Sequence, residues 1–169
     1  MRHDLHLSRG PASAFAAMAF FYLTFVGGCS GSTSGGMKIF RFQVAIKMLL
    51  SQLRFLIHTH GVFVSRYNGA PLSDEISRGV VAFSFFFFLT IAGLALALAM
   101  LGLDLVTALT GAATAVANVG PGLGDIIGPA GNFSTLPDAA KWLLCVGMLM
   151  GRLEILTVLV LLTPMFWRK

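Results

Sequence analysis

The sequence is poor in charged residues and in cysteine. Only 11% of its 169 residues are Asp, Glu, Lys or Arg, whereas 56% are apolar. This balance, together with fifteen Phe and nineteen Gly, is typical of a polytopic membrane protein and not of a soluble domain. The two cysteines, Cys29 and Cys145, both lie in apolar or membrane-depth segments, so we expect no disulfide framework.

Several functional signatures are also missing. The basic residues do not cluster with exposed aromatic residues, which argues against a nucleic-acid site. Met1-Arg2-His3-Asp4 is followed by mixed polar residues and Pro11, so we expect no cleavable signal and insertion directed by internal spans. His58 and His60 have no Cys or carboxylate at ligand spacing, which makes a metal site there improbable.

What is present is a stretch of small residues, 27–36, that interrupts an otherwise apolar segment. Neither flank, 12–26 or 37–57, reaches the about 20 apolar residues that a membrane span needs, but together with the insert they can cross. Non-helical backbone at membrane depth is tolerated only where it is buried in protein or lines a water-filled cavity. A broken membrane helix usually marks a permeation path. The stretch therefore predicts a channel or transporter, with these residues beside the pore.

The same stretch is compatible with other kinds of site. Gly27, Gly31 and Gly35 recur every fourth residue, which is also typical of a tight helix–helix contact, and both interpretations can hold. A nucleotide-binding loop fails because Met37 displaces the lysine and no Ser or Thr follows Lys38. No serine here has the flanking glycines of a nucleophile elbow. An enzyme is therefore not expected.

The second half of the chain predicts two long helices with a short one between them. Residues 80–103 contain no charge and predict a full transmembrane helix, in a helix that Ser73 caps. Residues 105–119 are short and rich in small residues, and a Gly- and Pro-rich run follows, which predicts a re-entrant pore helix and loop. Residues 141–167 predict a second span with Arg152 near its midpoint.

The distribution of charge predicts the topology. The 38–78 connection is basic, whereas the 104–141 connection is mainly acidic. By the positive-inside rule the first is cytoplasmic, the second external and the C-terminus cytoplasmic. The predicted fold is an all-α membrane protein with three parts: a broken transmembrane helix over 1–60, a cytoplasmic connection over 61–79, and a span–pore loop–span unit over 80–169.

The pore loop carries the predicted chemistry. Asn118, Val119, Gly120, Pro121 and Gly122 can turn backbone carbonyls toward an axis, because glycine adopts conformations closed to other residues. Rings of carbonyls replace the hydration shell of an alkali cation, and the negative C-terminal end of the pore helix favours a cation there.

Two charges lie within the last predicted span. A charge at a helix midpoint costs at least about 2.5–3.5 kcal/mol, so Arg152 is expected to face the bundle interior. It could hydrogen-bond the carbonyls of residues 27–36, present positive charge to a cation path, or belong to a buried structural pair. Glu154 is a poor partner for it at this spacing and is either a structural partner or part of conduction.

Three motifs together resemble a known family. Residues 27–38, 118–124 and 151–157 are similar to the membrane subunit of bacterial Trk potassium uptake systems, TrkH, in the Trk/Ktr/HKT superfamily. The resemblance implies four span–pore loop–span repeats around one pore. This chain would match the second span of the third repeat and all of the fourth, and the upstream repeats would have no counterpart in it.

The resemblance also implies roles. Asn118, Val119 and Gly120 would belong to the fourth filter strand, with potassium at Asn118 and Val119, and Arg152 would be the pore-side arginine near the gate. The intramembrane gating loop would comprise Gly27, Gly28, Ser30, Gly31, Ser32, Thr33, Gly35 and Gly36. Such proteins are dimers of the bacterial inner membrane. A cytoplasmic nucleotide-binding ring, TrkA, regulates them and would dock near residues 58–78. No cofactor is implied, and K⁺ is the transported ion.

One filter strand cannot surround an ion, so we expect potassium uptake from this chain only as the C-terminal part of a larger pore. Two alternatives remain open at this point. The chain could be a truncated, non-conducting membrane protein that assembles through its Gly-xxx-Gly faces. It could also be an ion-coupled carrier that uses Glu154 as a proton or cation site.

Overall fold

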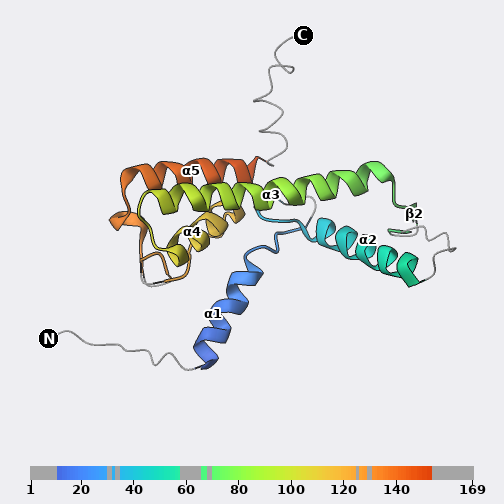
Figure 1. The fold of residues 1–169 in the computed structure, drawn as a ribbon, viewed down its shortest axis with the longest axis horizontal. Helices are drawn as coiled ribbons and strands as arrows, with labels where there is room; N and C mark the ends of the chain where they lie inside the picture. Colours follow the sequence, from blue (N-terminus) through green and yellow to red (C-terminus); the bar gives the residue numbers. More distant parts are fainter. Residues whose placement is uncertain are drawn as a thin grey trace, which may run out of the picture.

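The chain is predominantly helical in a computed structural model, as the sequence predicted (Figure 1). The structure describes residues 11–29, 32, 35–57, 66–67, 70–124, 126–128 and 131–153. A two-residue antiparallel pair, β1 with β2, lies in the connection between α2 and α3 and was not predicted. The elements are α1 (Pro11–Leu23), α2 (Ile39–Ile57), β1 (Arg66–Tyr67), β2 (Ala70–Pro71), α3 (Asp74–Met100), α4 (Leu105–Ala117), η1 (Phe133–Thr135) and α5 (Asp138–Arg152).

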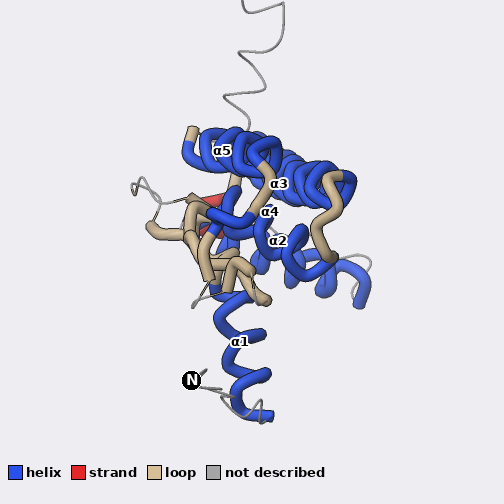
Figure 2. The backbone as a smooth tube through the Cα atoms, turned by 90° about the vertical axis from the view of Figure 1, so that its left-hand side faces the viewer, coloured by secondary structure: helices blue, strands red, loops and turns tan. Residues whose placement is uncertain are grey.

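Three helices, α3, α4 and α5, form the core. α3 is the longest, α4 and α5 pack along its C-terminal half, and α2 lies beside its N-terminal half, while α1 projects away from the group (Figures 1 and 2). α4 is the most buried helix, because residues 110–117 are buried without interruption. Its small residues, Ala, Thr and Gly, allow α3 and α5 to approach closely. Phe87 and Leu98 of α3 fill the space around α4.

α3 confirms the predicted helix over 80–103. The side chain of Ser73 caps it by accepting a hydrogen bond from the Ile76 amide at 3.4 Å, and Asp74 and Glu75 occupy the first turn. α3 ends at Met100, and Gly102 follows with a φ of +87°. Within the part of the chain that the structure describes, α3 is the one helix long and apolar enough to cross a membrane.

A basic residue joins α2 to α3. The guanidinium carbon of Arg41 lies 3.7 Å from the centroid of the buried Phe83 ring. A guanidinium over an aromatic face is a favourable cation–π arrangement. Arg41 therefore lies against α3.

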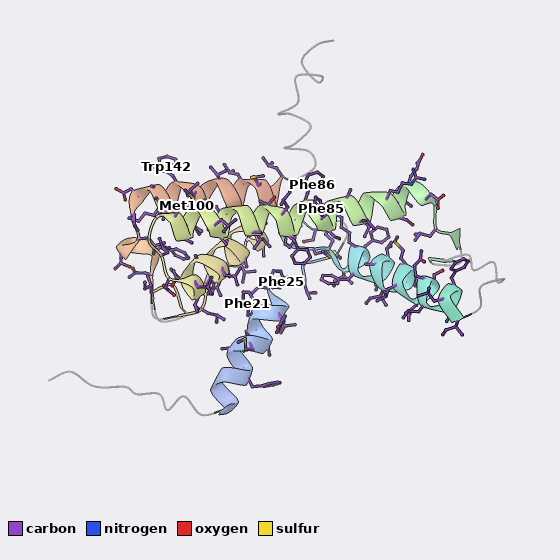
Figure 3. All side chains as sticks on the ribbon, in the orientation of Figure 1. Phe21, Phe25, Phe85, Phe86, Met100 and Trp142 are labelled. Carbon is purple, nitrogen blue, oxygen red and sulfur yellow. The ribbon has the colours of Figure 1, made fainter. Side chains whose placement is uncertain are left out.

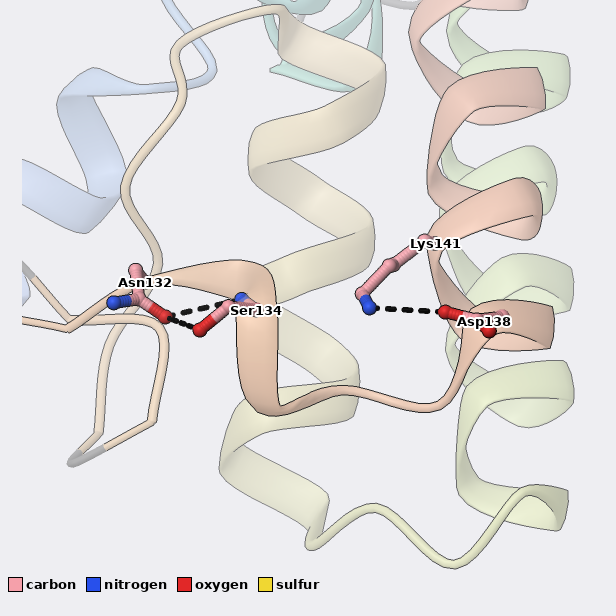
Figure 4. Close-up of polar contacts among 4 residues, drawn as sticks. All are labelled: Asn132, Ser134, Asp138 and Lys141. Atoms are coloured by element: carbon pink, nitrogen blue, oxygen red, sulfur yellow. Dashed lines mark hydrogen bonds and ion pairs between the residues drawn. The ribbon is translucent and has the colours of Figure 1, made fainter.

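Polar side chains lie at the start of α4 and in the connection between α4 and α5. Asp104 caps α4 by accepting from the Thr107 amide at 3.1 Å, and its hydrogen bonding with Thr107 lowers the pKa of the Asp104 carboxyl. Before α5, the side chain of Asn132 accepts from the Ser134 amide at 3.0 Å, and Lys141 pairs with Asp138 at 3.0 Å (Figure 4). Side-chain caps therefore mark the starts of α4 and η1, whereas α5 begins after Pro137 without one.

α5 is shorter than the sequence predicted. An unbroken helix over 141–167 was expected, but α5 ends at Arg152, and Leu153 leaves the helical region with a ψ of 9°. Gly147 and Gly151 favour a helix less than other residues do, which weakens its last turns. Arg152 is therefore the last residue of α5. Glu154 and the remainder of the predicted span lie outside the described residues.

Candidate functional site

The predicted interruption between the first two helices is present, and its two ends are tied together. The Gly27 amide donates to the Met37 carbonyl at 2.8 Å, the Met37 amide to the Phe25 carbonyl at 3.1 Å, and the Ile39 amide to the Gly28 carbonyl at 3.2 Å. We call residues 27–36 the gate loop, after their predicted role. Its predicted members Ser30, Gly31 and Thr33 lie outside the described residues, whereas Gly27, Gly28, Ser32, Gly35 and Gly36 are described.

Two glycines of the gate loop are required by close backbone contacts. A Cβ atom at Gly27 would lie 2.6 Å from the Gly35 carbonyl oxygen. A Cβ atom at Gly35 would lie 2.6 Å from the Ala117 carbonyl oxygen and 2.8 Å from the Asn118 Cβ. Because both glycines lie outside helices, their spacing serves a loop contact and not the helix–helix contact that was the alternative interpretation. The gate loop therefore rests on the C-terminal end of α4.

Asn118 closes that end of α4. It adopts the left-handed conformation, with φ of 55° and ψ of 41°. The backbone amide of Asn118 donates to the Ala115 carbonyl, and the backbone amide of Val119 donates to the Thr114 carbonyl, both at 3.0 Å. This pair of bonds is the Schellman motif, which satisfies carbonyls at the end of a helix and turns the chain sharply. The segment that follows leaves α4 in an extended course.

We call residues 118–122 the filter segment, after their predicted role. Val119 and Pro121 are exposed, and Gly120 has a φ of +115°, which L side chains rarely adopt. The chain then folds back along α4: the Gly122 amide donates to the Ile127 carbonyl at 2.8 Å, and Gly122 itself is buried against the Ile127 side chain. After α4 the chain therefore turns back along the same helix. That this course enters and leaves a membrane on one side stays a prediction.

Thr110 anchors the returning chain and was not among the predicted site residues. Its buried hydroxyl donates to the Val106 carbonyl at 2.7 Å and accepts from the Leu123 amide at 3.0 Å. Thr107 and Thr114 look the same in sequence, so no local signal distinguishes the threonine that holds the loop. The contact joins residues thirteen positions apart and is visible only in three dimensions.

Removing the Thr110 hydroxyl is expected to loosen the filter segment. Thr110→Val keeps the shape of the side chain but leaves the Leu123 amide without its acceptor, which costs about 1–3 kcal/mol. We expect the free energy of unfolding in detergent to fall by that amount. Thr90→Val is the matched control, because the Thr90 hydroxyl only donates to the Phe86 carbonyl of its own helix. Equal effects of the two changes would contradict an anchoring role for Thr110.

A cavity of about 390 Å³ separates the filter segment from α1. Phe20 and Phe21 of α1 and Thr24, just beyond its end, line one side of it. Val119, Pro121 and Leu123 line the other side. Phe21 and Phe25 lie at the end of α1 nearest the other helices, with their rings edge to face at 5.2 Å (Figure 3). One side of the filter segment thus faces an open, apolar cavity, and the other side packs against α4.

α5 meets the same end of α4 through glycine. A Cβ atom at Gly151 would overlap the Val116 carbonyl oxygen and lie 3.0 Å from the side-chain nitrogen of Asn118. Arg152 follows directly, with an exposed side chain. The structure therefore brings together the gate loop, the start of the filter segment and the residue before Arg152. Three motifs far apart in the sequence meet at one place.

Comparison with known proteins identifies the family of the chain. The family model described as "TrkH: Cation transport protein" matches residues 11–169. The chain belongs to the TrkH family. This confirms the family that the three motifs resemble.

Individual relatives in the TrkH family are similar over most of the chain. It is 82% identical over 156 residues to the Trk system potassium uptake protein TrkI of Halomonas elongata, a match that covers 92% of this chain and 32% of that protein. It is 38% identical over 155 residues to the Trk system potassium uptake protein TrkH of Vibrio parahaemolyticus, covering 92% and 31%. The crystal structure of the potassium transporter TrkH from Vibrio parahaemolyticus superposes with a TM-score of 0.82 at 37% identity, covering 91% and 32%. The chain therefore spans about a third of the length of the curated relatives it matches.

Proposed function

We propose that this chain forms the C-terminal part of a potassium-uptake pore of the bacterial inner membrane. The observation that carries the proposal is the contact at Gly35, where the gate loop lies on the carbonyl of Ala117 and the Cβ of Asn118, at the start of the filter segment. A loop that closes a pore has to lie against the element that lines it. Relatives named as potassium uptake proteins support the choice of ion.

The ion passes the filter segment in this proposal. Backbone carbonyls of Asn118 and Val119 bind K⁺, and Gly120, Pro121 and Gly122 complete the strand, in place of the hydration shell. The end of α4 points its negative dipole toward the ion. One strand is too little to surround an ion. The preceding repeats, in the part of the relatives that this chain does not match, complete a pore of four span–pore loop–span units.

The gate loop and Arg152 control passage in this proposal. Gly35 is buried beside the end of α4, so opening the pore requires the loop to leave this contact. Arg152, one residue beyond the contact of Gly151 with α4, supplies a positive charge that opposes a cation when the loop is closed. Ser30, Gly31, Ser32 and Thr33 complete the loop.

The rest of the proposal concerns topology and partners. α3 crosses the membrane with its N-terminal end in the cytoplasm, and the C-terminus of the chain is also cytoplasmic. The complete protein is a homodimer in the lipid bilayer. A TrkA-like nucleotide-binding subunit docks on the cytoplasmic face near residues 58–78. K⁺ is the transported ion, and no other cofactor takes part.

The contacts of Gly147 and Gly151 favour the pore over a non-conducting assembly protein. An assembly protein would use this Gly-xxx-Gly face against another chain. Within this chain, a Cβ atom at Gly147 would lie 2.5 Å from Leu94 Cδ2 of α3, and Gly151 touches the Val116 carbonyl of α4. The face is therefore already occupied. A carrier that uses Glu154 is the remaining alternative, and it predicts that Glu154→Asp keeps pH-dependent uptake while Glu154→Gln abolishes it.

A split-gene complementation experiment tests the proposal. Bacterial cells lacking potassium uptake receive this chain, the preceding two thirds of Halomonas elongata TrkI, or both on separate plasmids. We expect growth at low potassium only with both pieces. Absence of growth with both, although each is found in the membrane, would overturn the proposed function.

A further inference from the structure

Asn118 has a side chain where the backbone alone would favour glycine. Asn118 has the left-handed conformation at the end of α4. Glycine adopts this conformation at the lowest energetic cost, and asparagine is the less common residue there. The side chain makes a hydrogen bond to another helix: its Nδ2 donates to the Met148 carbonyl of α5 at 3.0 Å. It also lies 3.5 Å from the Val116 carbonyl. A carbonyl in a helix has a second lone pair for such a bond.

Three elements converge on this one residue. α5 approaches so closely that a Cβ atom at Gly151 would lie 3.0 Å from Asn118 Nδ2, and the gate loop so closely that one at Gly35 would lie 2.8 Å from Asn118 Cβ. Asn118 is also the first residue of the filter segment. The side-chain amide of Asn118 therefore links α5 directly to the filter segment, beside the gate loop.

We propose that Asn118 is a positioning residue: its side-chain amide fixes the start of the filter segment to α5, and the ion selectivity of the pore depends on this bond. The inference rests on the proposed function and goes beyond it, because there Asn118 acts only through its backbone carbonyl. Asn118 is exposed, yet its side-chain amide has a protein acceptor, the Met148 carbonyl at 3.0 Å, from a helix 30 positions away in the sequence. A shift of α5 or of the gate loop then moves Val119 and its carbonyl.

Asn118→Gly separates the side chain from the turn. Glycine keeps the left-handed conformation and removes the amide. Hydrogen bonds between membrane helices are individually modest, so we expect the ratio of K⁺ to Na⁺ uptake to fall about threefold to tenfold at unchanged membrane abundance. Asn118→Asp, which replaces the donor with an acceptor facing a carbonyl, is expected to lower the ratio at least as far. Asn132→Gly is the matched control, because Asn132 caps η1 outside the site, and it is expected to change nothing.

A second readout does not depend on transport. Hydrogen–deuterium exchange is measured on this chain joined to the preceding two thirds of TrkI, in detergent. In Asn118→Gly we expect faster exchange confined to residues 119–124, where the amides of Val119, Gly122 and Leu123 are hydrogen-bonded. Unchanged exchange and an unchanged uptake ratio would overturn the inference. A third outcome is faster exchange in Asn118→Gly together with a complete lack of K⁺ uptake by the unmutated protein. That outcome would support the positioning role and overturn the proposed function instead.

Discussion

Replacing Gly151 with alanine is expected to separate α5 from α4 and abolish potassium uptake. The added Cβ atom would overlap the Val116 carbonyl oxygen and lie 2.7 Å from the Val116 carbonyl carbon. Both are backbone atoms of a buried helix and cannot move aside as the end of a side chain can. Overpacking a core costs about 1–3 kcal/mol, and a clash with backbone belongs at or above the upper end of that range.

The control for Gly151→Ala is the same change at Gly93 of α3. No atom lies within 4 Å of a Cβ atom there, and alanine favours a helix over glycine by about 0.8–1 kcal/mol. We expect Gly93→Ala to be neutral or slightly stabilising and to leave uptake intact. The thermal unfolding midpoint in detergent measures both variants. A midpoint for Gly151→Ala equal to that of the unmutated protein would show that α5 does not lie against α4 as described.

Replacing Gly120 with alanine is expected to destroy ion selectivity while leaving the protein folded. Gly120 has a φ of +115°, and nothing lies within 4 Å of a Cβ atom there, so the cost is conformational and not a clash. Holding a non-glycine residue in such a conformation costs about 1–3 kcal/mol. The filter segment would relieve this strain by turning peptide units, which redirects the carbonyls that we propose bind the ion. We expect the ratio of K⁺ to Na⁺ uptake to fall on the order of tenfold or more.

Gly102→Ala is the control that introduces similar backbone strain outside the filter segment. Gly102 has a φ of +87°, also with nothing within 4 Å of a Cβ atom, but it lies between α3 and α4, away from the filter segment. Alanine there should lower the free energy of unfolding by a similar amount and leave the uptake ratio unchanged. If the two variants lose selectivity to the same extent, the filter segment has no special role in choosing the ion.

Much of the fold follows from local sequence. The uncharged run of 80–103 and the cap at Ser73 predict α3, and the small residues after Asp104 predict a short buried helix, because length, polarity and caps act within a few residues. The glycines of residues 27–36 likewise predict an interruption at the right place. These features do not depend on which other segments lie nearby.

The contacts within the site could not be predicted in this way. Thr110 with Leu123, Asn118 with Met148 and Gly35 with Ala117 each join residues far apart in the sequence, and their partners are backbone groups that every residue has. The end of α5 at Arg152 was missed as well, because an apolar run gives no local signal of where a helix stops. Sequence identified the right motifs, and packing decided which atoms of each motif meet.

Ion flux through a reconstituted chimera tests the central claim most directly. The last third of Halomonas elongata TrkI is replaced by this chain, and K⁺ and Na⁺ fluxes are measured in liposomes beside those of unmodified TrkI. The account predicts that the chimera passes K⁺ faster than Na⁺ and that Gly120→Ala removes the difference. A chimera that inserts and folds but passes no K⁺, while TrkI does so under the same conditions, would contradict the claim that this chain carries a filter strand and a gate.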